Sequence, residues 1–218
     1  MSSQRKEKTN VARAGWCSPG DRPLTFTAFI RAPSMRFLLL ASALSVCAFA
    51  FGQRELYALK KSDVSFVSDA PMERITAANR SASGILDIHD RDFAVRIPMR
   101  SFIGFNSSLQ QEHFYENYLE TEVWPNALFE GRIIEATDLS VPGSYNVRAK
   151  GRFTLHGIAR ERIIPCDVVV TREGLRVTGR FDVLLAEHGI RIPRVVQQKL
   201  AALVNVKLDL LFVPSSGK

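Results

Sequence analysis

Three side chains have types and a spacing that could hold a metal ion: His113, Glu116 and His156. His113 and Glu116 stand three residues apart and would share one face of a helix, and His156 could supply a third ligand from a strand. The sequence has no HExxH motif and no second histidine at helical spacing from His113. We therefore predict no metal site, and interpret His113 as a packing residue and His156, which precedes Gly157, as a turn residue.

No other motif indicates catalysis. The sequence contains no GxSxG nucleophile elbow, no phosphate-binding loop and no dinucleotide fingerprint. Cys166 is the only cysteine beyond the N-terminal 50 residues, and an unpaired cysteine within the run IIPCDVVV is typical of a small core residue. We predict that the protein is not an enzyme and needs no cofactor.

The formal charge of +7 is concentrated at the N-terminus. Residues 1–52 contain seven of the 29 basic residues and two of the 22 acidic ones, so the rest of the chain is nearly neutral. Binding to a polyanion requires a basic face or stripe. We therefore predict no nucleic-acid partner.

The N-terminal 50 residues resemble an extension followed by an export signal. Residues 1–34 are polar and lack apolar periodicity, so we interpret them as disordered or untranslated, with the translation start at Met1 or Met35. From Met35, a basic residue and a run of 14 apolar or small residues end in Ala48-Phe49-Ala50, which predicts a signal peptide at 35–50. The protein is thus expected in the periplasm or outside the cell.

Two alternatives exist for this segment. It could remain uncleaved as a membrane anchor, although it is short for a bilayer-spanning helix. Cys47 could be a lipidation site, but Val46 stands where that motif requires a small residue. Cleavage after Ala50 is the interpretation that we adopt.

Period-two alternation over residues 143–185 predicts three consecutive strands with one wet and one dry face. Residues 171–174 (TREG) indicate a tight turn before the third strand. The dry parity carries the apolar side chains of the first and third strands: Tyr145, Val147, Phe153, Leu155, Leu175, Val177, Phe181 and Val183.

The remaining pattern adds strands and two short helices. Strands are expected at 55–61, 63–68, 83–88, 92–102, 127–135 and 206–212, and helices at 109–121 and 195–204. Ser108 and Gln111 form the expected capping box of the first helix, and residues 71–83 could be a bulged strand or a loop. An all-β antiparallel barrel of about eight strands with one or two short helices, spanning 54–213, leaves no exposed sheet edge.

Four segments in order resemble the YceI-like family: SFIGF at 101–105, LQQEHFYENYLE at 109–120, PNALFEG at 125–131 and GRFTLHGI at 151–158. The resemblance covers roughly residues 55–213. It implies a lipocalin-like barrel, exported to the bacterial periplasm, that holds a polyisoprenoid or similar amphipathic chain, with a link to stress responses. The sequence departs from the family pattern at Gln111, where a basic residue is usual, and in its long N-terminal extension.

A barrel of about eight strands can be filled by side chains or can hold one slender ligand. Small residues on the dry parity, Ala149, Gly151 and Gly179, favour a cavity, whereas a filled core would make the protein a structural or interaction module. The expected partner is an isoprenoid-type lipid; a transient membrane contact and a homodimer stay open. We expect the ligand to be lined by Phe102, Phe105, Phe114, Tyr118, Phe129, Ala149, Gly151, Phe153, Leu155, Gly179 and Phe181.

Overall fold

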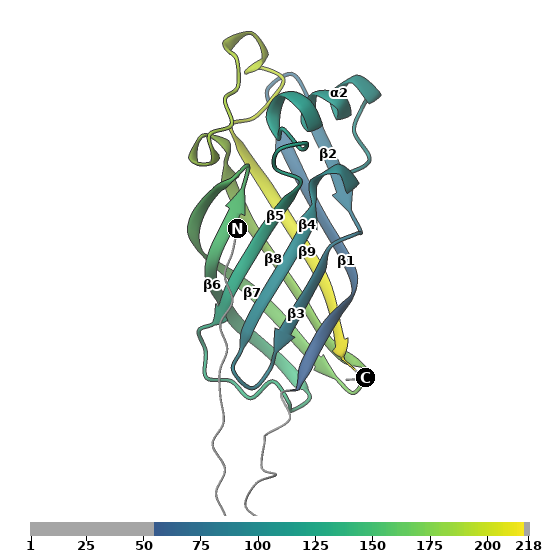
Figure 1. The fold of residues 1–218 in the computed structure, drawn as a ribbon, viewed down its shortest axis with the longest axis vertical. Helices are drawn as coiled ribbons and strands as arrows, with labels where there is room; N and C mark the ends of the chain where they lie inside the picture. Colours follow the sequence, from purple (N-terminus) through teal and green to yellow (C-terminus); the bar gives the residue numbers. More distant parts are fainter. Residues whose placement is uncertain (1–54, 216–218) are drawn as a thin grey trace, which may run out of the picture. The chain divides into compact units, whose positions relative to one another are not determined.

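The computed structural model describes residues 55–215, which form an antiparallel β-barrel with a short helix over one end (Figure 1). The expected extension at 1–34 and signal peptide at 35–50 lie outside the described residues. Gly52–Lys218 forms one compact unit, and the buried core of the described residues lies entirely within it. Within the described range, no helix has the length and apolar character needed to cross a bilayer.

The sheet is built from nine strands, and from β3 to β9 each strand pairs with the next one along the chain. Short helical segments connect them at one end of the barrel: η2 (Met99–Ser101), α2 (Ser108–His113), η3 (Phe114–Tyr118), η4 (Leu185–His188) and η5 (Arg194–Val196). The strands are β1 (Leu56–Asp69), β2 (Arg74–Asn79), β3 (Ser83–Asp87), β4 (Asp92–Pro98), β5 (Asn126–Ile133), β6 (Gly143–Leu155), β7 (Ile158–Thr171), β8 (Gly174–Leu184) and β9 (Leu203–Pro214).

Strand β1 closes the barrel because both of its edges are paired. One edge pairs with β9 from Tyr57 to Ser68. The other edge pairs first with β3 and then with β2, so β2 and β3 together occupy one position in the ring. The closed ring therefore has eight strand positions, which confirms the predicted barrel.

The predicted division of the first strand is wrong. Residues 56–69 form one continuous strand, β1, which runs without interruption through the break that we expected at residue 62. The register with β9 shifts between Leu59 and Lys61, so Lys60 is an extra residue in a β-bulge. A bulge accommodates consecutive polar residues without ending the strand. Residues 71–83 contain β2, one of the two expected alternatives.

The second predicted helix, 195–204, is also wrong. Only the 3-10 turn η5 forms there, and β9 begins at Leu203. Val195 is 90% exposed, so the apolar spacing that suggested a helix does not correspond to a buried face. The backbone from Leu203 onward pairs with β8 and β1 instead.

The first helix forms, with its start one residue earlier than predicted. Ser107, in extended conformation, is the N-cap, and its Oγ accepts a hydrogen bond from the Gln110 backbone N–H at 3.2 Å. The Gln110 Oε1 accepts from the Asn106 N–H at 3.1 Å, so Ser107 and Gln110 cap the helix, and the capping box expected at Ser108 and Gln111 is wrong by one residue. After His113 the helix continues as the π-helical turn η3.

The predicted meander at 143–185 is confirmed as β6, β7 and β8. Inward residues of β6, such as Val147, are buried, whereas its outward residues, such as Arg148, are exposed. Outward charges pair across strands; the Arg176 Nε lies 2.8 Å from the Asp209 Oδ1, and this hydrogen bond lowers the pKa of Asp209. The wet face is therefore the solvated outer wall.

Gly131 on β5 and Gly151 on β6 form a directly opposed pair. A Cβ added to Gly131 would lie 2.1 Å from the Lys150 carbonyl oxygen, and one added to Gly151 would lie 2.3 Å from the Glu130 carbonyl oxygen. The two backbones thus approach more closely than any side chain allows. Glycine at both positions permits this close approach.

We predict that Gly151→Ala lowers the free energy of unfolding by roughly 2 kcal/mol or more, because the new methyl group must displace the neighbouring backbone. Urea denaturation of Gly52–Lys218 measures this change. Gly143→Ala is the matched control, since the atoms nearest to its Cβ belong to the Tyr145 side chain, with the hydroxyl at 3.1 Å, and not to the backbone of a neighbouring strand. Equal stabilities of the two variants would contradict the close approach.

Candidate ligand-binding cavity

Two apolar cavities follow one another along the barrel interior. The upper cavity, of about 140 Å³, lies toward the end covered by α2. The lower cavity, of about 60 Å³, lies toward the other end. Four residues line both cavities and separate them: Val95, Phe129, Leu208 and Leu210.

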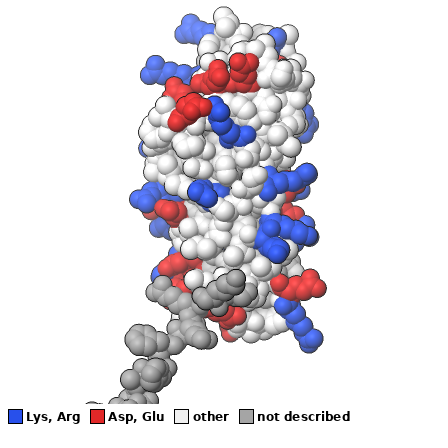
Figure 2. Space-filling view, turned by 45° about the vertical axis from the view of Figure 1, so that its right-hand side comes forward, with Lys and Arg blue, Asp and Glu red and all other residues white. Residues whose placement is uncertain are grey.

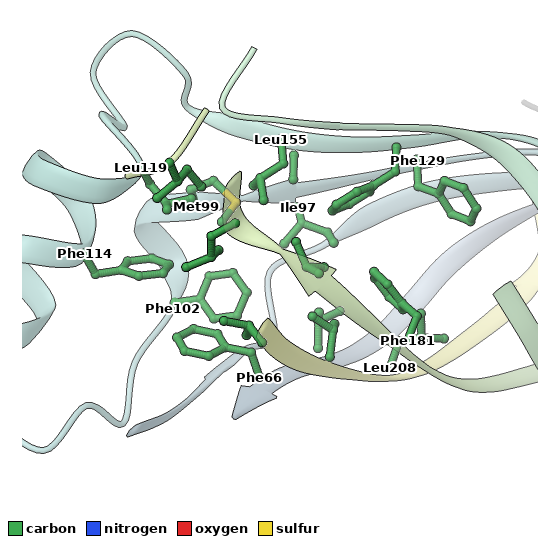
Figure 3. A pocket seen from close by; sticks show the side chains of 18 of the residues that line it. Phe66, Ile97, Met99, Phe102, Phe114, Leu119, Phe129, Leu155, Phe181 and Leu208 are labelled. Carbon is green, nitrogen blue, oxygen red and sulfur yellow. The ribbon is translucent and has the colours of Figure 1, made fainter. Parts of the chain in front are cut away.

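The upper cavity is lined by aliphatic and aromatic side chains, and no charged residue is among them. The sticks in Figure 3 are carbon throughout except for the sulfur of Met99. Ser68 and Tyr118 supply the only hydroxyl groups of the lining, and the Ser68 Oγ already accepts a hydrogen bond from the Ala201 N–H at 3.0 Å. Such a surface recognises shape and apolar area and offers no charge to bind a polar group.

Aromatic rings form two groups along the cavity. Near α2, the rings of Phe66, Phe102 and Phe114 lie with centroids 5.4 to 5.8 Å apart (Figure 3). Deeper in the barrel, Phe153 contacts Phe181 edge-on at 5.7 Å. At these separations the rings of each group are in contact with one another, so they narrow the cavity, which is suited to a slender chain.

The upper end of the cavity is closed by residues 107–122, which we call the lid. Phe114, Tyr118 and Leu119 of the lid point into the cavity lining. The π-helical turn places them there, because the Leu119 N–H donates to the Phe114 carbonyl, five residues back, at 3.0 Å. Such turns re-aim side chains within a helix and are frequent at functional sites.

Polar contacts fasten the middle of the lid to the barrel wall. The Tyr115 hydroxyl lies 2.7 Å from the Phe102 carbonyl oxygen and 2.9 Å from that of Arg100. The Gln111 Nε2 donates to the same Phe102 oxygen at 3.0 Å and to the Tyr115 hydroxyl at 2.7 Å. Gln111 therefore holds the lid against the segment that follows η2.

The end of the lid is tied to the β6–β7 turn. The Glu120 Oε2 lies 3.1 Å from the His156 Nε2, and the His156 Nδ1 lies 3.0 Å from the His188 carbonyl oxygen. His156 and Gly157 both have positive φ, 50° and 72°, as a two-residue hairpin turn requires. The interpretation of His156 as a turn residue is confirmed.

His113 and Glu116 do not join His156. His113 is exposed, and the carboxylate beside His156 belongs to Glu120 instead. The described residues contain no group of three His, Cys, Asp or Glu side chains that could hold a metal ion. His113 is not the buried packing residue that we expected.

His188 and Cys166 are buried groups that could be mistaken for catalytic residues. The His188 ring is fully buried, packs edge-on against Phe153 at 5.4 Å, and its Nδ1 lies 3.0 Å from the Ile158 carbonyl oxygen. Burial lowers the pKa of His188, so the ring is a neutral donor. Burial raises the pKa of the Cys166 thiol to about 11, which leaves it protonated and unreactive at neutral pH.

Most of the expected lining residues face the cavities. The upper cavity is lined by Phe102, Phe114, Tyr118, Phe129, Phe153, Leu155 and Phe181, and the lower cavity by Ala149 and again Phe129.

Three expected residues line neither cavity. Phe105 packs behind the lining, with its ring 5.0 Å from that of Phe114. At Gly151, the backbone of Glu130 and Gly131 takes up the space that a side chain would need. At Gly179, a Cβ would meet the Cys166 Sγ at 3.2 Å. Neighbouring atoms already fill the space beside both glycines, so the missing side chains do not widen the cavity.

Other lining residues were not predicted. Val64, Phe66, Ile97, Val206 and Leu208 share the inward parity of β1, β4 and β9, so alternation in those strands could have identified them. Ile190 and Leu200 lie outside regular strands, and no local signal marks them.

The fold and site can now be compared with known proteins. A model of the YceI-like domain matches residues 57–212. The chain belongs to the YceI-like family. No curated protein sequence matches it.

Solved structures share the YceI-like barrel. They include a polyisoprenoid binding domain from Saccharophagus degradans implicated in plant cell wall breakdown, with a TM-score of 0.62, 15% identity, and coverage of 73% of this chain and 98% of that chain. They also include BcnA of Burkholderia cenocepacia, with a TM-score of 0.56, 18% identity, and coverage of 69% and 95%. These similarities establish the fold.

We predict that the free energy of unfolding falls below about pH 6.5. The pKa of His188 is lower in the folded protein than in the unfolded chain, so in that range the unfolded chain binds a proton that the folded protein does not bind. His188 lowers the free energy of unfolding by at most about 1.4 kcal/mol per pH unit. This decrease stops once the pH falls below the pKa of His188 in the folded protein, because both states then carry the proton. Urea denaturation of wild type and His188→Gln at about pH 7 and pH 5 checks it. Equal losses in the two proteins would contradict the assignment.

Proposed function

We propose that this YceI-like protein binds a polyisoprenoid or a similar slender amphipathic chain inside its barrel. The observation that carries the proposal is the cavity lining, which lies along the barrel axis and includes no charged residue. An apolar chain satisfies such a lining completely, whereas a polar ligand would lose its hydrogen bonds to water. Binding involves no chemical step.

The size of the cavities restricts the ligand. Drug-sized ligands occupy pockets of roughly 300–1,000 Å³, whereas the upper cavity measures about 140 Å³. A thin hydrocarbon chain can thread such a space and displace neighbouring side chains as it enters. Burial of ten carbons contributes about 8 kcal/mol before ordering costs, which corresponds to roughly micromolar affinity.

The lining also orients the ligand. A polar head group finds no partner in the cavity and therefore stays at a barrel end. The lid end is the better candidate, because the upper cavity reaches Phe114 and Tyr118 of the lid and Leu200 of the loop beside it. Entry then requires the lid contacts of Tyr115 and Glu120 to open.

Related proteins support this ligand class. The Saccharophagus degradans domain of the same fold is described as polyisoprenoid binding. The segment at 35–50 supports export, and a carrier or sequestering role follows from a binding protein in that compartment. Because the family resemblance implies a link to stress responses, the proposal also includes a role of this carrier in such a response.

We predict that Phe153→Asp lowers uptake of an isoprenoid alcohol at least about 100-fold, because it places an unpaired carboxylate in the upper cavity. Val206→Trp, which fills the same cavity without a charge, should also abolish uptake. Fluorescence titration of Gly52–Lys218 with a fluorescent isoprenoid alcohol gives the affinity, and circular dichroism confirms folding.

Lys150→Ala is the matched control for these variants. Lys150 is exposed on β6, three residues before Phe153 and on the opposite face of the strand. It should bind the probe as the wild type does. Equal binding by folded Val206→Trp and Lys150→Ala would show that the cavity is not the site, and would favour a closed barrel that acts as an interaction module.

A further inference from the structure

We propose that residues 191–200, which we call the tip loop, dock the protein on a membrane surface rich in anionic lipid. The tip loop leaves the barrel between η4 and β9, at the same end as α2 (Figure 1). It contains the turn η5 and projects beyond the strands. Docking by the tip loop does not depend on which ligand the cavity holds.

The first observation is an exposed apolar tip. Val195 is 90% exposed, the highest value among the large apolar side chains of the described residues. Met72, in the adjacent β1–β2 turn, is 65% exposed, and its N–H donates to the Gln198 carbonyl of the tip loop at 2.8 Å. Two apolar side chains are thus presented together on neighbouring turns.

The second observation is charge. Arg191, Arg194 and Lys199 are exposed, and none of them forms an ion pair with a described residue. No acidic residue occurs in the sequence from 188 to 208. Unpaired cations around an exposed apolar tip are complementary to an anionic bilayer, where the cations meet lipid phosphates and the apolar group enters the interface.

The third observation is the charge of the opposite flank. The lid carries four exposed carboxylates, of which Glu122 pairs with Arg100 and Glu120 contacts His156, and Figure 2 shows acidic side chains near this end of the molecule with basic ones beside them. The same anionic bilayer would repel the acidic flank. The protein should therefore approach with the tip loop first; the acidic residues are Glu112, Glu116, Glu120 and Glu122.

The tip loop is also continuous with the cavity. Ile190, the residue before the loop, and Leu200, its last residue, both line the upper cavity. A chain leaving a bilayer at the docked loop would meet apolar side chains from the membrane surface to the barrel interior. Docking at this surface would thus place the membrane next to the lid end.

The experiment is vesicle co-sedimentation of Gly52–Lys218, the unit with its own complete core. Vesicles of phosphatidylcholine alone are compared with vesicles in which phosphatidylglycerol replaces about a third of it. We expect binding only to the anionic vesicles, and weaker binding as salt is added, since each basic residue at the surface strengthens binding roughly five-fold.

The decisive variants differ only in where charge is removed. The triple change Arg191→Gln, Arg194→Gln, Lys199→Gln should weaken binding roughly 100-fold. The control triple, Lys150→Gln, Arg172→Gln, Arg180→Gln, removes the same charge from exposed sites outside the tip loop and should bind as the wild type does. Equal weakening by both triples, or no binding of the wild type to anionic vesicles, would overturn the proposal.

Val195→Asp tests the apolar contact. It should reduce vesicle binding while leaving uptake of the isoprenoid alcohol from solution unchanged, because Val195 does not line either cavity. Val206→Trp should show the reverse, with vesicle binding intact and uptake lost. Unchanged vesicle binding by Val195→Asp would show that Val195 does not contact the membrane. This result does not depend on whether the cavity binds lipid.

Discussion

The pairing of β1 with β9 is the constraint on which the rest of the structure depends. These strands are the first and last of the barrel, and their register runs from Tyr57–Pro214 to Ser68–Val204. Without this pairing the sheet would have two open edges and its apolar face would meet water. With it, inward residues from all strands surround a dry interior, and the cavity lining can be free of charge.

Closure also explains why the functional features gather at one end. Beside β2, residues 99–105 complete the barrel wall. Ile103 forms a bridge with Ala78 of β2, and the buried Asn79 side chain donates a hydrogen bond to the Pro98 carbonyl at 2.6 Å. The lid packs against this irregular segment. The upper cavity, the lid and the tip loop therefore adjoin, and uptake and membrane docking would occur side by side.

The sequence predicted the features that depend on local periodicity. Alternation along 143–185 identified three strands and the inward residues of the first and third, because burial in a half-buried strand repeats every second residue. It failed where a residue's role depends on a partner distant in sequence. Gly151 suggested empty space, but Gly131 and the Glu130 carbonyl use that space. The apolar spacing of 195–204 suggested a helix, but the segment ends in a strand paired to β1 and β8.

The central claim is that the barrel interior holds an apolar chain. Native mass spectrometry of Gly52–Lys218, purified from the expressing cell without detergent and followed by solvent extraction, tests it most directly. The account predicts a mass excess that disappears on extraction, with an isoprenoid-type hydrocarbon in the organic phase. Protein of the bare polypeptide mass, which gains no mass when an isoprenoid alcohol is added, would contradict it.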